Sequence, residues 1–360
     1  MLSQIEIKGF KSIKEAKFDL RNLNLLIGAN GAGKSNLVAV FGLLNQMVEG
    51  RLQPTVTKLG GAATLLHGGP KHTEKITLGL TFGANGYQTT LEYAQDDSLF
   101  FAEEYATFQA KGYTMPYVET LGAGHKESKL VEMATRKRVV SFVLDALRAW
   151  RVYHFHDTSP GAAVKRKGAL DDNATLRPDA ANLAAFLYRL KEKEHDAYRR
   201  IVAAVQQVAP FFSDFSLSPD RLYPDQIQLE WTERDSDAYF SAHAFSDGTL
   251  RFICLATLLL QPELPSLILI DEPELGLHPY AITQLAALFR SAATRTQVLV
   301  ATQSVTLMNQ FEPADVVVVD RKDGQSTFRR IDEKEIDAWK DSYSLGELWE
   351  KNVLGGRPQR

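Results

Sequence analysis

The chain has 360 residues and a formal charge of −3 at pH 7; 44% of its residues are hydrophobic and 24% are charged. These proportions exclude a disordered, collagen-like or purely coiled-coil chain, and the length allows two compact units or one large α/β domain with an insertion. The longest apolar run, Phe252–Leu260, is too short to span a membrane and the start lacks a secretory signal, so we expect a cytoplasmic protein without membrane contact. The lone Cys254 is expected to be a packed core thiol.

The first third of the chain is expected to place strands before a helix and then to form an antiparallel sheet. Alternating or continuous apolar residues predict strands at 5–7, 16–18 and 23–27, and apolar positions at helical spacing predict a helix over 34–48. The glycine-rich residues 50–75 indicate an extended surface connection. Within residues 76–110, stretches of apolar residues recur at every second position, and Asn85-Gly86 between two of them indicates a hairpin turn.

The rest of the chain is expected to be helical and then α/β. Helical spacing covers 127–150 and 179–208, with a strand and turn between them over 152–160. Beyond residue 220 we expect strands at 227–231, 267–270, 298–301 and 316–319, and helices at 249–260 and 280–292. A last helical segment, 344–356, either packs on the rest of the chain or docks a partner subunit.

A phosphate-binding loop is predicted at GANGAGKS, Gly28–Ser35. The segment fits G-x-x-x-x-G-K-[ST] and lies between a predicted strand and a predicted helix. Glycine lets the backbone N–H groups approach phosphates closely, and the helix start adds a positive dipole end. Lys34 is expected to reach the β- and γ-phosphates of a nucleotide, and Ser35 to ligate Mg²⁺. The expected nucleotide-binding residues here are Gly28, Ala29, Asn30, Gly31, Ala32, Gly33, Lys34, Ser35 and Asn36.

A second chemical motif is LILIDEP, Leu267–Pro273, a buried apolar strand that ends in two acids. Ionised carboxylates at such a position are costly unless they serve a cation or a proton transfer. Asp271 therefore fits an outer ligand of Mg²⁺, and Glu272 fits the general base that polarises the attacking water. A structural ion pair is the alternative.

The segment FSDGTLR, Phe245–Arg251, precedes the acidic strand and opens a predicted helix. Ser-Asp-Gly alone also makes an ordinary helix cap. Placed between the phosphate loop and the acidic strand, however, it resembles the signature of ABC-type ATPase heads of the SMC and RecF class. Two further segments, Glu272–Pro279 (EPELGLHP) and Thr302–Ser304 (TQS), are most similar to the OLD nuclease group and its stand-alone AAA family relatives. The resemblance covers about residues 1–50 and 240–310.

This resemblance implies an α/β P-loop NTPase fold, an ABC-type head with an antiparallel lobe and an inserted helical subdomain. The implied division is an N-terminal lobe over 1–125, a helical insertion over 126–215, a C-terminal lobe over 216–343 and a tail over 344–360. The implied activity is ATP binding and hydrolysis with Mg²⁺.

In such heads two protomers sandwich two ATP molecules. Ser246 and the backbone of Gly248 would then meet the γ-phosphate bound by the partner copy. Gln303 would orient a water or the γ-phosphate, and Lys11, in the segment GFKS, would lie near the nucleotide. Asp247 departs from the glycine usual in ABC signatures. Because Gln303 stands where transporters have histidine and an amide cannot carry a proton, we expect slow turnover.

Three interpretations remain open for His154 and His156 in the segment HFHD. They could be packed at a strand end, form a metal-binding pair on one strand face, or belong to the loop that reports the nucleotide state to the inserted lobe.

The segment from Lys126 to Lys167 contains ten basic and four acidic residues. This excess of basic residues fits double-stranded DNA binding or a solvated helix face.

Two functions remain open: a DNA-associated ATPase of recombination or repair, and a regulatory ATPase that controls a separately encoded effector, such as a TOPRIM-type nuclease in anti-phage defence. A transport motor fits poorly, and a nucleotide-gated scaffold with little turnover remains open. Only 57 residues follow Gln303, too few for a TOPRIM domain, so we expect no nuclease in this chain.

Overall fold

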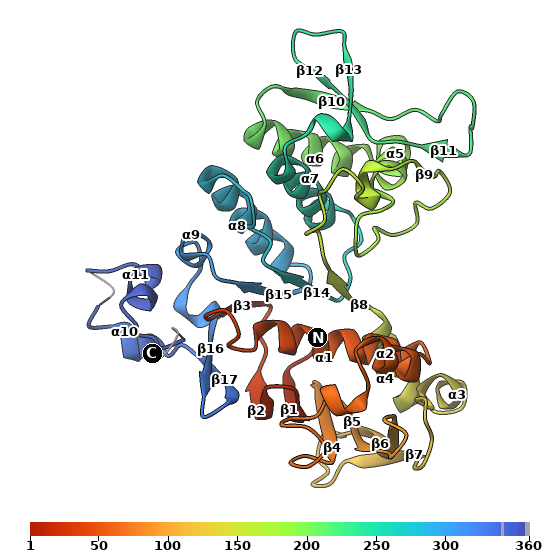
Figure 1. Cartoon of the computed structure of the whole chain (residues 1–360), viewed down its shortest axis with the longest axis vertical. Helices are drawn as coiled ribbons and strands as arrows, with labels where there is room; N and C mark the ends of the chain where they lie inside the picture. Colours follow the sequence, from red (N-terminus) through yellow and green to blue (C-terminus); the bar gives the residue numbers. More distant parts are fainter. Residues whose placement is uncertain (340–341, 357–360) are drawn as a thin grey trace. The chain divides into compact units, whose positions relative to one another are not determined.

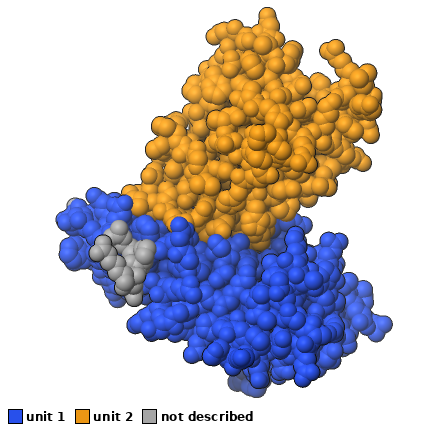
Figure 2. Space-filling view, in the orientation of Figure 1, with its two compact units in different colours: residues 1–151, 312–360 blue, residues 152–311 orange. Residues whose placement is uncertain are grey.

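The protein is described by a computed structural model that covers residues 1–339 and 342–356. It forms two compact units (Figure 1). Unit 1 comprises residues 1–151 and 312–360, and unit 2 comprises residues 152–311 (Figure 2). The four-part division inferred from the sequence stays a prediction.

Unit 1 contains a six-stranded antiparallel sheet of order β2-β1-β4-β5-β6-β7. Its strands are β1 (Gln4–Phe10), β2 (Ile13–Asp19), β4 (Lys75–Phe82), β5 (Asn85–Tyr93), β6 (Leu99–Phe108) and β7 (Tyr117–Gly122). The predicted hairpin is confirmed, but its turn is Gly83-Ala84, with Gly83 at φ +63°, and Asn85-Gly86 begins β5. The left-handed backbone falls on the glycine that precedes the predicted turn.

Unit 1 contains three further strands, the first of which leads into the predicted phosphate-binding loop. β3 (Leu23–Ile27) pairs in parallel with β16 (Val316–Lys322), which pairs antiparallel with β17 (Gln325–Arg330). All five side chains of β3 are buried, as the continuous apolar run predicts. α1 (Lys34–Val48) follows β3 and has the predicted bounds. The short helices η4 (Pro313–Asp315), α10 (Glu333–Ile336) and α11 (Leu345–Glu350) complete this part.

The prediction of an extended connection over 50–75 was wrong. This segment contains α2 (Leu52–Lys58) and the 3₁₀ helix η1 (Ala62–Thr64). Leu52 and Val56 are buried, and the Glu127 carboxylate accepts hydrogen bonds from the N–H groups of Leu52 and Gln53 at 2.7 and 2.9 Å. The cap of α2 thus comes from a residue far along the chain.

The helix predicted over 127–150 is divided into α3 (Leu130–Ala134) and α4 (Arg138–Arg148). The strand and turn predicted over 152–160 also differ from the structure. β8 spans only Trp150–Tyr153, so His154 and His156 lie in irregular backbone and share no strand face.

Unit 2 carries two parallel strands, β14 (Leu267–Asp271) and β15 (Gln297–Thr302), with α7 (Asp247–Leu260), α8 (Pro279–Ala293) and α9 (Val305–Met308). Its other elements are η2 (Ala163–Lys165), β9 (Gly168–Ala169), α5 (Leu183–Lys193), α6 (His195–Val208), β10 (Phe212–Ser216), β11 (Gln226–Ile227), β12 (Glu230–Glu233), β13 (Tyr239–Ser241) and η3 (Ala242–Ala244). β10, β12 and β13 form a three-stranded antiparallel sheet, and β9 pairs with β11.

The core of unit 2 includes an aromatic cluster beside α7. The rings of Trp231 and Phe245 stack with centroids 4.5 Å apart, and Phe212 packs against both. Cys254 is buried in α7 as expected, and this burial raises the pKa of its thiol to about 12. Among the described residues, no helix combines the length and apolar character needed to cross a bilayer.

Candidate functional site

The predicted site residues are divided between the two units: the phosphate loop lies in unit 1, and the acidic pair and the signature lie in unit 2. In unit 1, the loop connects β3 to α1 and surrounds the ammonium group of Lys34. This side chain is only 5% exposed, and its Nζ donates to the carbonyl oxygens of Gly28 at 2.6 Å and Ala29 at 3.1 Å. Among the residues that the structure describes, no side chain caps the N-terminus of α1 at Gly33. A buried ammonium beside an uncapped helix start fits the binding of a phosphate.

Two glycines of the loop are required by close packing. Gly33 has φ +117°, and a Cβ added to it would lie 2.0 Å from Oγ of Ser326. A Cβ on Gly28 would lie 2.2 Å from the carbonyl oxygen of Val319. The loop is therefore shaped by the backbone and by β16 and β17.

Ser326 on β17 is a site residue that sequence reasoning missed. It is buried, and its hydroxyl contacts the carbonyl oxygen of Ala32 at 2.5 Å and Oγ of Ser12 at 2.6 Å. Asn36, in the first turn of α1, donates from Nδ2 to the same Ser12 oxygen at 2.6 Å. Serine in an edge strand gives no signal of its own, and only the pairing of distant segments reveals it.

Ser12 belongs to GFKS, so the structure connects this segment to the loop and to α1. Lys11 has φ +47° and its pKa is lowered by burial; its backbone carbonyl contacts Nδ1 of His67 at 2.7 Å. Gly9 has φ +76°, and an added Cβ would collide with the carbonyl oxygen of Lys75. The approach of Lys11 to a nucleotide stays a prediction.

The tail also reaches the loop. The N–H of Ala29 donates to the carbonyl oxygen of Gly356 at 2.8 Å. Leu348 and Leu354 are buried, and Arg329 donates to the Leu354 carbonyl at 2.9 Å. Within the described residues the segment 344–356 thus packs on its own unit, one of the two alternatives for it.

In unit 2, the acidic pair stands at the end of β14. Glu272 has φ +42°, a left-handed conformation that L side chains rarely adopt, and its N–H donates to the carbonyl oxygen of Ala301 at 2.7 Å. The side-chain amide of Gln303 donates to the Glu272 carboxylate. Backbone strain of this kind is typical of functional sites. The structure therefore brings together the predicted base and the predicted orienting residue.

Glu274 is a second residue that the sequence did not identify. Its Oε1 accepts a hydrogen bond from the Thr302 hydroxyl at 2.5 Å and one from the Gln303 N–H at 3.4 Å. Its other oxygen, Oε2, is buried without a hydrogen-bond partner among the described residues, and burial raises the pKa of the carboxyl group. Glu274 thus fixes the turn that carries Gln303.

The signature forms the N-terminus of α7. Oγ of Ser246 accepts a hydrogen bond from the Thr249 N–H at 3.1 Å, so Ser246 is the N-cap. Ser246 and Asp247 are exposed. A Cβ on Gly248 would lie 2.3 Å from the carbonyl oxygen of Gly276, so the segment after the acidic pair packs directly on the signature.

Arg251 connects α7 with the segment that follows β8 through hydrogen bonds. Its guanidinium, 5% exposed, donates from Nε to the Phe155 carbonyl at 2.9 Å and from Nη2 to the His156 carbonyl at 3.1 Å. Phe155, His156 and Arg251 line one small hollow with Asp271 and Glu272. One charged side chain therefore connects the signature helix with the surroundings of the acidic pair.

His154 has its pKa lowered by burial and by the neighbouring His156, while Asp271 acts in the opposite direction. Within the described residues no three His, Cys, Asp or Glu side chains are grouped to hold a metal ion. The metal-pair interpretation thus gains no further ligand here.

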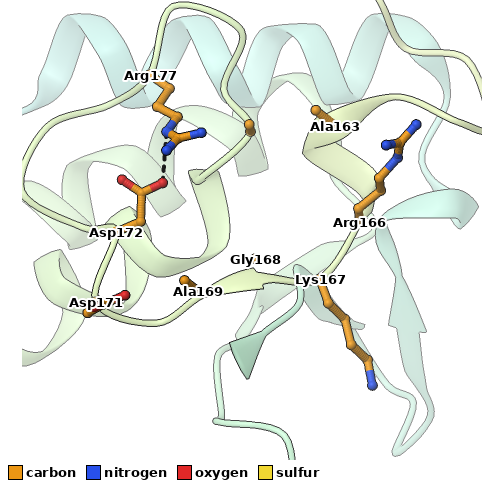
Figure 3. Close-up of a pocket in the computed structure, with 9 residues that line it drawn as sticks. Ala163, Arg166, Lys167, Gly168, Ala169, Asp171, Asp172 and Arg177 are labelled. Atoms are coloured by element: carbon orange, nitrogen blue, oxygen red, sulfur yellow. Dashed lines mark ion pairs between the residues drawn. The ribbon is translucent and has the colours of Figure 1, made fainter. Parts of the chain in front are cut away.

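A separate hollow of about 590 Å³ lies in unit 2 beside β9 (Figure 3). Arg166, Lys167 and Arg177 line it, but Arg177 pairs with Asp172 at 2.8 Å and Lys167 pairs with Asp220. None of the predicted site residues lines this hollow.

The basic segment 126–167 is divided between the two units. Lys126 pairs with Asp96 at 2.8 Å and Lys137 with Glu119 at 3.3 Å, whereas Lys165 is only 6% exposed. Fewer of its charges are available to a nucleic acid than the sequence suggests.

Two family models match the chain. One, described as "AAA domain, putative AbiEii toxin, Type IV TA system", matches residues 130–309, half of the chain. The other, described as "AAA ATPase domain", matches residues 1–107. A curated relative is the Old nuclease of Escherichia phage P2, with 22% identity over 385 aligned positions that cover 95% of this chain. The chain spans 63% of the length of that relative.

Solved structures of Smc heads share the fold. The SmcHead bound to the C-winged helix domain of ScpA has a TM-score of 0.62 and 16% identity, covering 97% of this chain and 99% of that one. The Smc head domain with an extended coiled coil, bound to the C-terminal domain of ScpA from Pyrococcus furiosus, has a TM-score of 0.56 and 15% identity, covering 94% and 98%. The α/β P-loop head fold predicted from the motifs is confirmed.

Proposed function

Because this chain belongs to the AAA domain family whose model matches its residues 130–309, and is an ATPase, we propose that it hydrolyses MgATP slowly. Lys34 binds the β- and γ-phosphates, and Ser35 and Asp271 hold Mg²⁺, which neutralises phosphate charge. Glu272 polarises the attacking water. The remaining nucleotide-binding residues are Gly28 to Gly33, Asn36 and Lys11.

The contact between the Gln303 amide and the Glu272 carboxylate is the observation that carries this assignment. The two residues directly follow different strands, β14 and β15, and Glu272 has a strained backbone conformation. An amide can orient a carboxylate, a water or a phosphate oxygen but cannot relay a proton. This chemistry supports slow turnover.

We further propose that ATP joins two copies of the chain, with Ser246 and Gly248 of each copy completing the site on the other. The supporting observation is that the N-terminus of α7, a helix of 14 residues, is exposed at Ser246 and Asp247. The start of such a helix favours negative charge through its N–H groups and its dipole. Loss of the γ-phosphate on hydrolysis would then loosen the pair.

The test is the solution mass of the Glu272→Gln protein with and without MgATP. We expect a monomer that doubles only with MgATP, because ATP remains intact when the base is removed. The double variant Glu272→Gln with Lys34→Ala is the matched control and should stay monomeric. A Glu272→Gln protein that binds ATP with unchanged mass would refute the sandwich.

For the pathway, we propose a DNA-associated process as in recombination or repair, supported by the basic segment 126–167. Arg136, Lys137 and Arg138 are exposed and are its candidates for phosphate contact. Duplex binding should weaken steeply with salt, and Arg136→Glu with Lys137→Glu should flatten that dependence. Absence of binding at low salt would exclude this role.

The similarity to the Old nuclease favours a second candidate function, the control of a separately encoded nuclease. Co-expression with the product of an adjacent reading frame, followed by measurement of the stoichiometry and ATP dependence of the complex, tests it. A complex whose nuclease activity does not respond to ATP would argue against this regulation.

A further inference from the structure

Lys165, in the basic segment, brings its ammonium group close to the signature. Its side chain is 6% exposed; Nζ donates to the Thr158 carbonyl oxygen at 2.5 Å and lies 3.8 Å from Oδ1 of Asp247. Asp247 itself is 67% exposed. The two residues are far apart in the sequence, and each belongs to unit 2. The buried ammonium group of Lys165 therefore lies next to the exposed carboxylate of Asp247, the first residue of α7.

The backbone around Lys165 is held in place. Its N–H donates to the Ala162 carbonyl oxygen at 3.1 Å, and η2, which carries it, packs against η3, the segment just before the signature. Arg251 and Lys165 both bind carbonyl groups of residues 155–158. The ammonium group is thus positioned by the fold rather than by the long, flexible stem of a surface lysine.

An isolated carboxylate at this place would oppose the proposed sandwich. Asp247 lies between Ser246 and Gly248, the two residues expected to meet a γ-phosphate, and like charges brought together at an interface repel each other. A neighbouring ammonium lowers that repulsion because the pair carries no net charge. The positive end of α7 and the Ser246 hydroxyl can then attract the phosphate.

We propose that Lys165 is a positioning residue of the signature: by neutralising Asp247, it allows this turn to receive the terminal phosphate of the ATP bound by a second copy of the chain. This inference rests on the proposed ATP sandwich. It explains why the chain carries both an aspartate in the signature and a lysine buried behind it.

The experiment measures the dimer dissociation constant with MgATP in the Glu272→Gln background. Lys165→Met keeps the apolar stem but leaves Asp247 unpaired, and it should weaken each composite site about tenfold, hence the two-site dimer about a hundredfold. Asp247→Asn leaves the ammonium in place and should leave the dimer equally tight or tighter. The double variant should regain most of the lost affinity. Lys167→Met, which removes an exposed lysine of the same segment, is the matched control and should have no effect.

The signs of these effects separate charge compensation from a structural tether. If the pair only tethers η2 to α7, Lys165→Met and Asp247→Asn will weaken the dimer alike and the double variant will not recover; this result, or an unchanged Lys165→Met dimer, overturns the proposal. Binding of a fluorescent ATP analogue by the monomer and the melting temperature verify folding. If Lys165→Met does not fold, Asp247→Asn decides, since a weakening of more than about threefold contradicts the proposal. Failure of the Glu272→Gln protein itself to dimerise with ATP bound would identify the sandwich, rather than the role of Lys165, as the error.

Discussion

The phosphate loop of unit 1 and the signature region of unit 2 are held by different forces. Gly28 and Gly33 pack against a carbonyl group and a buried serine so closely that neither has room for a Cβ. The signature is instead held by polar side chains, with Lys165 facing Asp247 and Arg251 binding two carbonyl groups. The first region depends on shape and the second on charge and hydrogen bonding. Substitutions should therefore act by different rules in the two regions.

The largest effect is expected where shape decides. Gly33→Ala places a Cβ against Ser326 in a backbone at φ +117°, and ATP affinity should fall about a hundredfold or more. Gly31→Ala is the matched control. This glycine has φ +78°, and among the described residues no atom beyond its chain neighbours lies within 4 Å of an added Cβ, so only backbone strain remains and the loss should be about tenfold. Calorimetric titration with ATP measures both. Equal losses would show that packing against Ser326 does not shape the loop.

In the signature region, Arg251→Met keeps the volume but leaves the carbonyl groups of Phe155 and His156 without this donor. The free energy of unfolding should fall by about 2 kcal/mol, measured by urea denaturation. Arg200→Met, at an exposed position on α6, should change it by less than about 0.5 kcal/mol. A similar change in both variants would mean that the buried hydrogen bonds of Arg251 contribute little.

A smaller effect, on the rate of ATP turnover, is expected for substitutions of Glu274. Glu274→Ala removes the acceptor that holds Thr302 and Gln303, and turnover should fall about tenfold while ATP affinity stays the same. Glu274→Gln keeps an acceptor oxygen at the same place and should retain most of the activity. Steady-state phosphate release together with ATP binding separates the two quantities. Loss of ATP affinity in Glu274→Ala would contradict a role limited to positioning Gln303.

The smallest effect is expected for Ser326→Ala. It removes the hydroxyl contacts to Ala32 and Ser12 without adding volume, so the KM for ATP should rise about threefold with kcat unchanged. A fall in kcat at constant KM would place the influence of Ser326 on hydrolysis rather than on binding.

Local patterns predicted much of the molecule. β3, α1, the end of β14 and the start of α7 lie within a few residues of their expected positions, because apolar runs, glycine spacing and caps are short-range signals. The residues that were missed depend on partners distant in the sequence. The cap of α2 comes from Glu127, Ser326 reaches the loop from β17, and Lys165 was counted with a basic surface although the fold buries it. No local pattern contains these pairings.

The buried thiol of Cys254 has a practical consequence for following dimerisation. Since the side chain is 3% exposed and its pKa is raised to about 12, maleimide reagents should not modify it in the native protein. A cysteine introduced at an exposed position, such as Leu222, which is 83% exposed, would then carry a fluorophore without removal of the native residue. Energy transfer between labelled copies could report the ATP-dependent encounter in real time on an otherwise unaltered core.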